Sequence, residues 1–580
     1  MRRILPILAA TTCLVPVAHA ATILPLDRAT ILAGSPFDMK VEFDGVVAAD
    51  AVAVTINGRP AAEVLGQDAA FIEKEDGVEA SAVRINAGAI TTPGTYTVEA
   101  KAGDETKTVT WEVYGTPDQP VAKNVILMIA DGLSVADRTT ARLMSKGMTE
   151  GKANGRLNLD DLQYMAFIGT SATNSIATDS ANTASAYATG HKTAVNALGV
   201  YADRTKDSQD DPKVEVIAEA LKRTGGKSFG VVTTSELQDA TPAAMFSHTR
   251  LRADKADIAT MLLDQRPDVI LGGGSAYLLP QSTPGSKRKD DENLVVKFQD
   301  AGYALATSAE ELAAADGSNS GKILGLFHTG NMDSVYDREV SKGGTVAQFP
   351  DQPGLVQMTE TAIGQLSKNP EGFVVMIEAA NVDKRKHPLD WERAMIDLIE
   401  FDKAVGVARE FVAANPDTLL IVTGDHTHGN SLIGSIDPSR GEGRESVGVY
   451  ADAGFLGYTD ENGDGYPDSL DVAPRIAMFS SNFPDYYETW GPKLDNPFEP
   501  AVQDEAKNYQ ANAEYQNVPG ATFREGNLPK SADTGVHAVD DMVLQAEGAG
   551  AENFRGYMEQ SDVYRVIAEV LALAPSKPSN

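Results

Sequence analysis

The stretch Val125-Ile-Leu-Met-Ile-Ala-Asp131 consists of six apolar residues followed directly by an aspartate. A continuous apolar run of this length, without polar alternation, is typical of a strand buried on both faces of a parallel sheet. Residues 373–378 repeat the pattern and end in Glu378, and residues 419–425 repeat it and end in Asp425. Ligand sites in such folds lie outside the carboxyl ends of the strands. One such acid could be a helix cap, but three of them predict a site at one edge of the sheet.

From Val121 onward, apolar strands alternate with helices. The helical stretch 214–223 precedes a glycine pair and the apolar run 229–234, and another apolar run covers 268–271. This alternation predicts an α/β fold with a mainly parallel sheet flanked by helices. Residues from about 430 to 530 are less regular and rich in Gly, Pro, Asp and Asn, so we expect a surface insertion there.

Residues 21–115 have a different pattern from the rest of the chain. The run 51–56 leads into the turn dipeptide Asn57-Gly58, and apolar residues alternate with polar ones along 109–113. Short strands of this kind, separated by Gly and Pro, predict a small immunoglobulin-like β-sandwich domain. The stretch 115–120 contains two prolines and is typical of a linker to the larger domain at 121–580.

Residues 1–20 have the features of a secretory signal peptide. Two arginines precede a short apolar stretch, and Ala18-His19-Ala20 matches the cleavage pattern. No later segment has eighteen uninterrupted apolar residues, so no membrane span is expected. The predicted location is therefore exported, either periplasmic or secreted. The single cysteine, Cys13, lies inside the signal peptide, so the mature chain is expected to contain no disulfide.

The formal net charge of the 580-residue chain is -32, from 50 basic and 82 acidic residues. A field of this sign repels polyanions, which argues against nucleic-acid binding as the main role. An anionic substrate would need local positive charge at its binding site, from metal ions or from a placed arginine.

A serine and two groups of metal-ligating residue types supply candidate chemistry. Ser180 begins a run of small residues that can form a closely packed helix, whose N-terminal N–H groups attract anions. Asp383 and His387 have the i, i+4 spacing that places both on one helical face, and Asp425-His426 offers two adjacent ligands; both pairs suit zinc. A hydroxyl nucleophile beside clustered divalent cations favours phosphoryl transfer, although Ser180 alone could be a helix cap.

An acidic stretch within the expected insertion matches the calcium-loop template. Oxygen ligands stand at positions 1, 3, 5, 7, 9 and 12, with glycine at position 6. The last ligand is Asp instead of the usual Glu, and flanking helices are not evident, so a plain acidic turn is the alternative. The candidate calcium ligands are Asp460, Asn462, Asp464, Tyr466, Asp468 and Asp471.

Six separated motifs lie along residues 121–570: Asp131-Gly132, Thr178-Asp-Ser180-Ala, Glu236-Leu-Gln-Asp239-Ala-Thr241-Pro-Ala-Ala244, residues 378–387, Asp425-His426 and Gly535-Val-His537. In their order and approximate spacing they resemble the alkaline phosphatases, here with an N-terminal β domain added. Asp239 and Lys384 match the variant usual in bacterial members of the family.

The resemblance implies a role for each matching residue. Ser180 would be the nucleophile that forms a phosphoserine intermediate, with two Zn²⁺ ions and one Mg²⁺ ion beside it. The implied ligands are Asp383, His387 and His537 for the zinc that activates water, Asp131, Asp425 and His426 for the zinc that deprotonates Ser180, and Asp131, Thr241 and Glu378 for magnesium.

The resemblance also implies residues that hold phosphate and orient ligands. Arg252 fits the family's phosphate-binding arginine, and Arg250 is the alternative. Lys384 would contact phosphate through water, Asp239 would order the water shell of magnesium, and His428 would orient a zinc ligand. Cobalt or manganese could also fill such oxygen- and nitrogen-rich sites.

The implied partners are small phosphomonoester substrates and, as is common in the family, a second copy of the chain in a homodimer. Two other functions stay open at this point. One is a phosphodiesterase or sulfatase on the same fold, although no C/S-x-P-x-R context surrounds Ser180. The other is a non-enzymatic adhesion or phosphate-scavenging protein, suggested by the β domain and the calcium loop.

Overall fold

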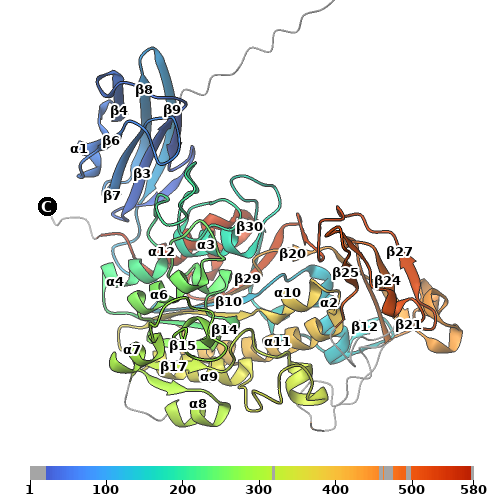
Figure 1. Cartoon of the computed structure of the whole chain (residues 1–580). Helices are drawn as coiled ribbons and strands as arrows, with labels where there is room; N and C mark the ends of the chain where they lie inside the picture. Colours follow the sequence, from blue (N-terminus) through green and yellow to red (C-terminus); the bar gives the residue numbers. More distant parts are fainter. Residues whose placement is uncertain (1–20, 317–320, 456–461, 463–474, 491–497, 576–580) are drawn as a thin grey trace, which may run out of the picture.

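A sheet of ten strands forms the centre of the computed structural model, which describes residues 21–316, 321–455, 462, 475–490 and 498–575 (Figure 1). The expected signal peptide at 1–20 lies outside the described residues. Strands neighbour one another in the order β16-β17-β15-β14-β18-β10-β19-β29-β13-β30. Their bounds are Ala304–Ala306, Ile323–Leu326, Val269–Gly273, Ser228–Glu236, Phe373–Ala379, Asn124–Ala130, Thr418–Thr423, Met542–Gly548, Tyr164–Gly169 and Arg555–Glu559.

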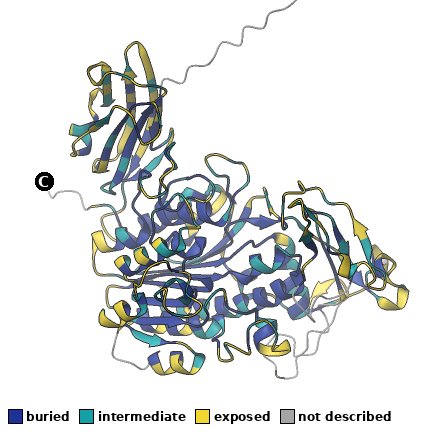
Figure 2. Cartoon of the chain, in the orientation of Figure 1, coloured by how far each residue is buried: buried dark blue, intermediate teal, exposed yellow. Residues whose placement is uncertain are grey.

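The three apolar runs that end in acids form the three adjacent central strands β18, β10 and β19. Both pairings are parallel, and Glu378 lies opposite Ile129, two residues before Asp131. Every residue of β10 and β18 is buried, which explains their unbroken apolar sequence (Figure 2). Only β29 runs antiparallel to both of its neighbours. The predicted α/β fold with a mainly parallel sheet is confirmed.

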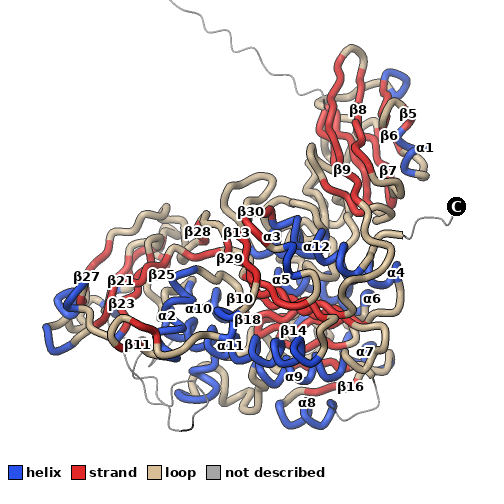
Figure 3. The backbone as a smooth tube through the Cα atoms, turned by 180° about the vertical axis from the view of Figure 1, so that it is seen from behind, coloured by secondary structure: helices blue, strands red, loops and turns tan. Residues whose placement is uncertain are grey.

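Helices cover both faces of this sheet (Figure 3). The long helix α11 packs with α2 and α9 on one face, and α3, α4, α5 and α12 lie on the other. The bounds are Trp391–Ala414 for α11, Val135–Lys146 for α2, Leu355–Leu366 for α9, Ser180–Thr189 for α3, Ile217–Thr224 for α4, Ala240–Ala243 for α5 and Gln560–Leu571 for α12. The remaining helices of this part are α6 (Lys255–Gln265), α7 (Leu294–Asp300), α8 (Ala309–Asp316) and α10 (Asn381–Lys386).

The predicted small β region precedes the large sheet and consists of two packed sheets. Their orders are β1-β3-β7-β6 and β2-β9-β8-β4-β5, and Phe37 and Trp111 meet edge to face between them at 5.6 Å. The bounds are Ala21–Leu24, Phe37–Phe43, Ala82–Gly88 and Ala70–Ile72 for the first sheet, and Thr30–Leu32, Glu105–Tyr114, Gly94–Ala102, Val52–Ile56 and Arg59–Pro60 for the second, with α1 at Ala61–Leu65. The exact domain boundaries, 21–115 and 121–580, stay a prediction.

The β region is attached to the segment that follows α3. Tyr201 and Val214 of that segment belong to the hydrophobic core of the β region. The fully buried Lys40 ammonium lies 2.8 Å from a Glu75 carboxylate oxygen, and it also pairs with Asp203 of the same segment. A buried charge is tolerated only when it is paired in this way, so the docking geometry is specific.

The expected insertion at about 430–530 leaves and rejoins the main fold at one short ladder. Strand β20 (Thr427–His428) pairs with β28 (His537–Ala538), and His428 lies directly opposite His537. Between them lie small antiparallel pairings of β21 (Asn430–Ile436), β22 (Val447–Gly448), β23 (Ile476–Ser480), β24 (Tyr486–Glu488), β25 (Ala501–Gln503), β26 (Tyr509–Ala511) and β27 (Thr522–Arg524). The last described pair, β11 (Met148–Thr149) with β12 (Lys152–Ala153), follows α2.

The candidate calcium loop falls almost wholly outside the described residues. Of its six ligands only Asn462 is described, and its side chain is exposed. Among the described helices, none combines the length and the apolar character that a membrane crossing requires.

Candidate metal centre

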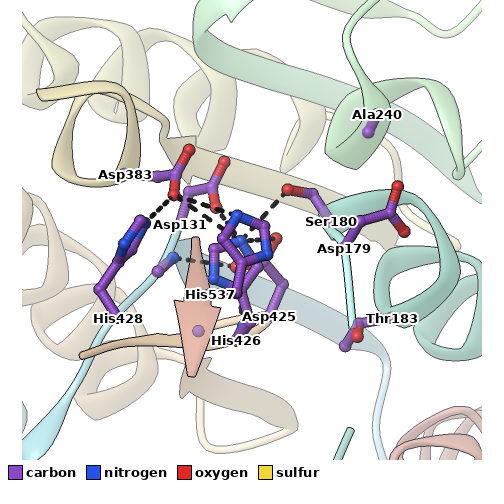
Figure 4. A network of polar contacts seen from close by, with 12 residues as sticks. Asp131, Asp179, Ser180, Thr183, Ala240, Asp383, Asp425, His426, His428 and His537 are labelled. Carbon is purple, nitrogen blue, oxygen red and sulfur yellow. Dashed lines mark hydrogen bonds and ion pairs between the residues drawn. The ribbon is translucent and has the colours of Figure 1, made fainter. Parts of the chain in front are cut away.

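Ser180 is the first residue of helix α3, and its hydroxyl points toward a cluster of acids and histidines (Figure 4). Asp179 caps the helix by accepting a hydrogen bond from the Asn182 amide at 3.1 Å. The Ser180 Oγ lies 3.3 Å from His426 Nε2. All ten residues of the helix are buried, and most of them are small, which allows the helix to pack close to its neighbours.

Asp131, Asp425 and His426 form the first group of metal-ligating atoms, all mutually within 4.8 Å. His426 Nε2 lies 3.1 Å from Asp131 Oδ1 and 3.6 Å from Asp425 Oδ2. Neither of these two buried carboxylate oxygens receives a hydrogen bond from the described part of the chain. Burial, followed by the charges of Asp383, Asp425 and Glu378, raises the pKa of Asp131 well above its usual value. A cation at this position would satisfy these oxygens, so the group fits a metal ion.

Asp383, His426, His428 and His537 form a second group of metal-ligating atoms, with the same mutual limit of 4.8 Å. His428 contacts Asp383 Oδ1 through Nε2, whereas His387 Nε2 lies 3.2 Å from the other carboxylate oxygen, Oδ2. The second group therefore contains His428, which the sequence predicted to orient a ligand. His387, a predicted ligand, lies beside this group.

The tautomers of His387 and His537 favour these two as ligands. Nδ1 of His387 lies 2.7 Å from the Gly535 carbonyl oxygen, and Nδ1 of His537 lies 2.8 Å from that of Thr178. A ring that donates through Nδ1 to a carbonyl keeps the Nε2 lone pair free, which is the usual arrangement of a metal-bound histidine. Burial lowers the pKa of His428 to about 3 and, with the neighbouring His426, lowers that of His537 well below its usual value. Neutral imidazoles such as those of His428 and His537 can bind a metal. For His387, burial acts to lower the pKa, but the Asp383 carboxylate outweighs it and raises the pKa.

Glu378, near the end of β18, and Thr241, in α5, are two further buried residues with oxygen donors. Thr241 Oγ1 is buried and has no hydrogen-bond partner in the described part of the chain. Glu378 accepts a hydrogen bond from the Thr233 hydroxyl, and burial raises its pKa to about 7. Helix α5, which carries Thr241, contacts β18, which carries Glu378. An oxygen-only donor set of this kind fits a hard cation such as magnesium.

Asp239 lies between two cationic side chains, Arg252 and Lys384. Its carboxylate accepts a hydrogen bond from Arg252 at 2.7 Å and pairs with Lys384. Burial acts to raise the pKa of Asp239, but Lys384, Arg252 and Lys255 outweigh it and hold the pKa well below its usual value. Arg252 also lies 3.6 Å from Asp179. Arg250 instead donates to the carbonyl oxygens of Asp203 and Thr205, away from the site.

Lys386 contributes to the site and was missed by sequence reasoning. Its buried ammonium donates to the Gly132 carbonyl oxygen and lies 2.7 Å from Asp137 Oδ2. It therefore joins the helix that carries Asp383 to the turn that carries Asp131. The run Lys384-Arg-Lys386 is typical of a solvated helix face, so the sequence alone contained no signal for this contact.

Comparisons with known proteins agree with this arrangement of residues. The sequence profile of a family described as alkaline phosphatase matches residues 122–573. The chain belongs to the alkaline phosphatase family. It is 33% identical over 384 residues to the alkaline phosphatase of Escherichia coli strain K12, a match covering 60% of this chain and 77% of the relative.

Other relatives extend the comparison over more of the chain. The tissue-nonspecific alkaline phosphatase of Gallus gallus is 29% identical over 499 residues, covering 79% of this chain and 86% of the relative. The crystal structure of Thermus thermophilus alkaline phosphatase superposes with a TM-score of 0.56 at 23% identity, covering 80% and 94% of the two chains, which supports the shared fold. The family, the fold class and the phosphatase activity expected from the sequence are thereby confirmed.

The raised pKa of Glu378 leads to a prediction about the metal-free protein. A carboxyl group whose pKa rises from 4.5 to about 7 on folding opposes folding increasingly as the pH rises through that interval. After chelation, Glu378→Gln should therefore be more stable than the native protein at pH 8, by up to about 3 kcal/mol, and nearly equal to it at pH 4.5. Thermal unfolding of both proteins across this pH range measures the difference.

With zinc and magnesium restored, the order of stability should reverse because the variant lacks one carboxylate charge. A constant stability difference between the two chelated proteins from pH 4.5 to pH 8 would contradict the raised pKa of Glu378.

Proposed function

We propose that this chain is an exported metal-dependent phosphomonoesterase that hydrolyses small phosphate monoesters through a phosphoserine intermediate at Ser180. The observation that carries the proposal is the position of the Ser180 hydroxyl, 3.3 Å from Nε2 of His426, the residue shared by both groups of metal ligands. A hydroxyl placed this close to two candidate cation positions is suited to nucleophilic attack on phosphorus.

The assignment of residues to two Zn²⁺ ions and one Mg²⁺ ion follows the family resemblance, and the clustered donor atoms support it. Bound there, the cations would lower the pKa of the serine hydroxyl and of water and would offset the charge of the reacting phosphoryl group. We assign Asp383, His387 and His537 to one zinc, Asp131, Asp425 and His426 to the other, and Asp131, Thr241 and Glu378 to magnesium. His428 orients Asp383 through its direct contact.

The chain's own residues then account for both steps. Ser180 Oγ loses its proton and attacks phosphorus in line with the leaving oxygen, so the bond from phosphorus to that oxygen breaks and the alcohol departs with a proton. Water next attacks the phosphoserine, which releases inorganic phosphate and restores the hydroxyl. Arg252 grips two phosphate oxygens, and Asp239 holds Arg252 and Lys384 toward them. Amide groups at the start of α3 add positive potential.

The exported location and the homodimer are part of this proposal. The signal-peptide pattern of residues 1–20 supports export. The dimers that are common in the family support a homodimer. N-terminal sequencing of the mature protein and light scattering would test the two statements.

Replacement of the nucleophile gives the sharpest test of the function. Ser180→Ala should lower kcat for 4-nitrophenyl phosphate by about four orders of magnitude or more, because it removes the hydroxyl that forms the intermediate. The native enzyme should hydrolyse this monoester far faster than bis(4-nitrophenyl) phosphate or 4-nitrophenyl sulfate. Equal circular dichroism spectra and metal contents serve as the control. Undiminished turnover by Ser180→Ala, or preference for the diester or sulfate, would overturn the assignment.

Arg252 and Arg250 form a matched pair for testing the phosphate grip. Arg252→Ala should raise the inhibition constant of inorganic phosphate by about tenfold to a hundredfold, because a charge-assisted pair of hydrogen bonds is lost. Arg250→Ala removes the same charge two residues away, from a side chain bound to backbone carbonyls, and should change the constant less than about twofold. Equal inhibition constants for the two variants would remove Arg252 from this role.

Elemental analysis tests the cofactors, including Ca²⁺ at the acidic loop. We expect two zinc ions and one magnesium ion per chain, lost together with activity on chelation, and one calcium ion held by Asp460, Asn462, Asp464, Tyr466, Asp468 and Asp471. Asp464→Asn should abolish calcium binding and leave zinc and magnesium unchanged, because the loop is separate in sequence from their ligands. An unchanged calcium content in Asp464→Asn would reduce the loop to an acidic turn.

A further inference from the structure

A row of charged side chains leads outward from the phosphate-gripping arginine. Asp239 Oδ1, which binds Arg252, also lies 3.9 Å from the Lys255 ammonium. Lys255 pairs with one carboxylate oxygen of Glu236, and the Lys287 ammonium lies 3.3 Å from the other. Each charge in the row thus contacts the next, from the buried site to the surface.

The outer part of the row is organised around one aromatic ring. The Lys287 ammonium lies 5.0 Å from the centroid of the Tyr277 ring, and the Lys255 ammonium lies 5.9 Å from it. Cations within about 6 Å of a ring centroid are attracted to its face. The ring and the shared Glu236 carboxylate therefore hold two ammonium groups side by side.

Lys287, at the outer end of the row, is the most accessible of these side chains. Its exposed fraction is 53%, compared with 21% for Lys255 and 25% for Arg252. The two lysines share the single carboxylate of Glu236, and each ammonium can donate three hydrogen bonds. An arriving anion can therefore bind both of them without displacing Glu236.

The charge of the whole chain makes this local excess of cations informative. At -32 the molecule repels dianions, yet Arg252, Lys255, Lys287 and Lys384 gather here against Asp179, Asp239 and Glu236. A phosphate monoester with an uncharged leaving group would need only Arg252, Lys384 and the metal ions. The lysines further out have no part in the steps described above.

We propose that Lys255, Lys287 and Tyr277 form a subsite for a second anionic group of the substrate, beyond the phosphate held by Arg252. The preferred substrates are then phosphomonoesters that carry a second phosphate or similar anion, such as bisphosphates. This inference rests on the proposed function, because Arg252 must hold the first phosphate for the lysines to meet the second.

Two non-hydrolysable ligands test the subsite without turnover. Propane-1,3-bisphosphonate and propylphosphonate differ only in the second anionic group, and calorimetry on the zinc- and magnesium-loaded protein gives both dissociation constants. At low ionic strength, and after correction for the statistical factor of two, the bisphosphonate should bind about fivefold tighter than propylphosphonate. This preference should shrink as salt is added, because the lysines are partly exposed.

Lys287→Gln and Lys289→Gln provide the decisive comparison. Lys289 is exposed, lies two residues away, and has the same charge. Lys287→Gln should reduce the preference for the bisphosphonate to about the statistical factor of two, whereas Lys289→Gln should keep it. Equal preferences in the two variants, or no preference in the native protein, would overturn the subsite. Absence of 4-nitrophenyl phosphate turnover by the native enzyme would instead contradict the proposed function. The two failures can be distinguished because the binding ratios do not depend on catalysis.

Discussion

The repulsion between buried carboxylates at one edge of the central sheet constrains the rest of the structure. Asp131, Glu378 and Asp425 project from three adjacent strands, and burial with mutual repulsion raises the pKa of Asp131 and of Glu378. Such a concentration of acids is stable only beside cations. The fold supplies Lys384 and Lys386 from the same short helix, and the remaining unpaired oxygens call for metal ions.

The nucleophile reaches this cluster because its helix can pack unusually close to its neighbours. Helix α3 contacts both α5 and α12, and its alanines allow the approach. Gly190 ends the helix with a φ of +77°, and a Cβ atom there would lie 2.9 Å from the Tyr564 ring. The small residues that follow Ser180 therefore allow close helix packing as well as placing the hydroxyl at the site. A serine held on a rigid, buried helix is positioned with little freedom.

The strand ends were predictable from the sequence because buried strands and their terminal acids are local patterns. Asp131, Glu378 and Asp425 followed from continuous apolar runs, and the same physics places them together in a parallel sheet. Contacts between distant segments have no local pattern. The sequence therefore contained no signal that Lys386 is buried against Gly132, or that Lys255 and Lys287 meet at one carboxylate. These pairings depend on how helices and loops fold back over the sheet.

The segment after α3 connects the β region to the reaction centre through backbone contacts. The Asn196 amide donates to Asp179 Oδ2 at 3.0 Å, and its carbonyl oxygen accepts from the Arg252 amide at 2.9 Å. Further along the same segment, Asp203 pairs with the buried Lys40 of the β region. The segment that aligns Asp179 with Arg252 is thus fixed at its far end by a desolvated ion pair. Because such pairs tolerate little displacement, the β region restricts the movement of the segment that contacts Arg252.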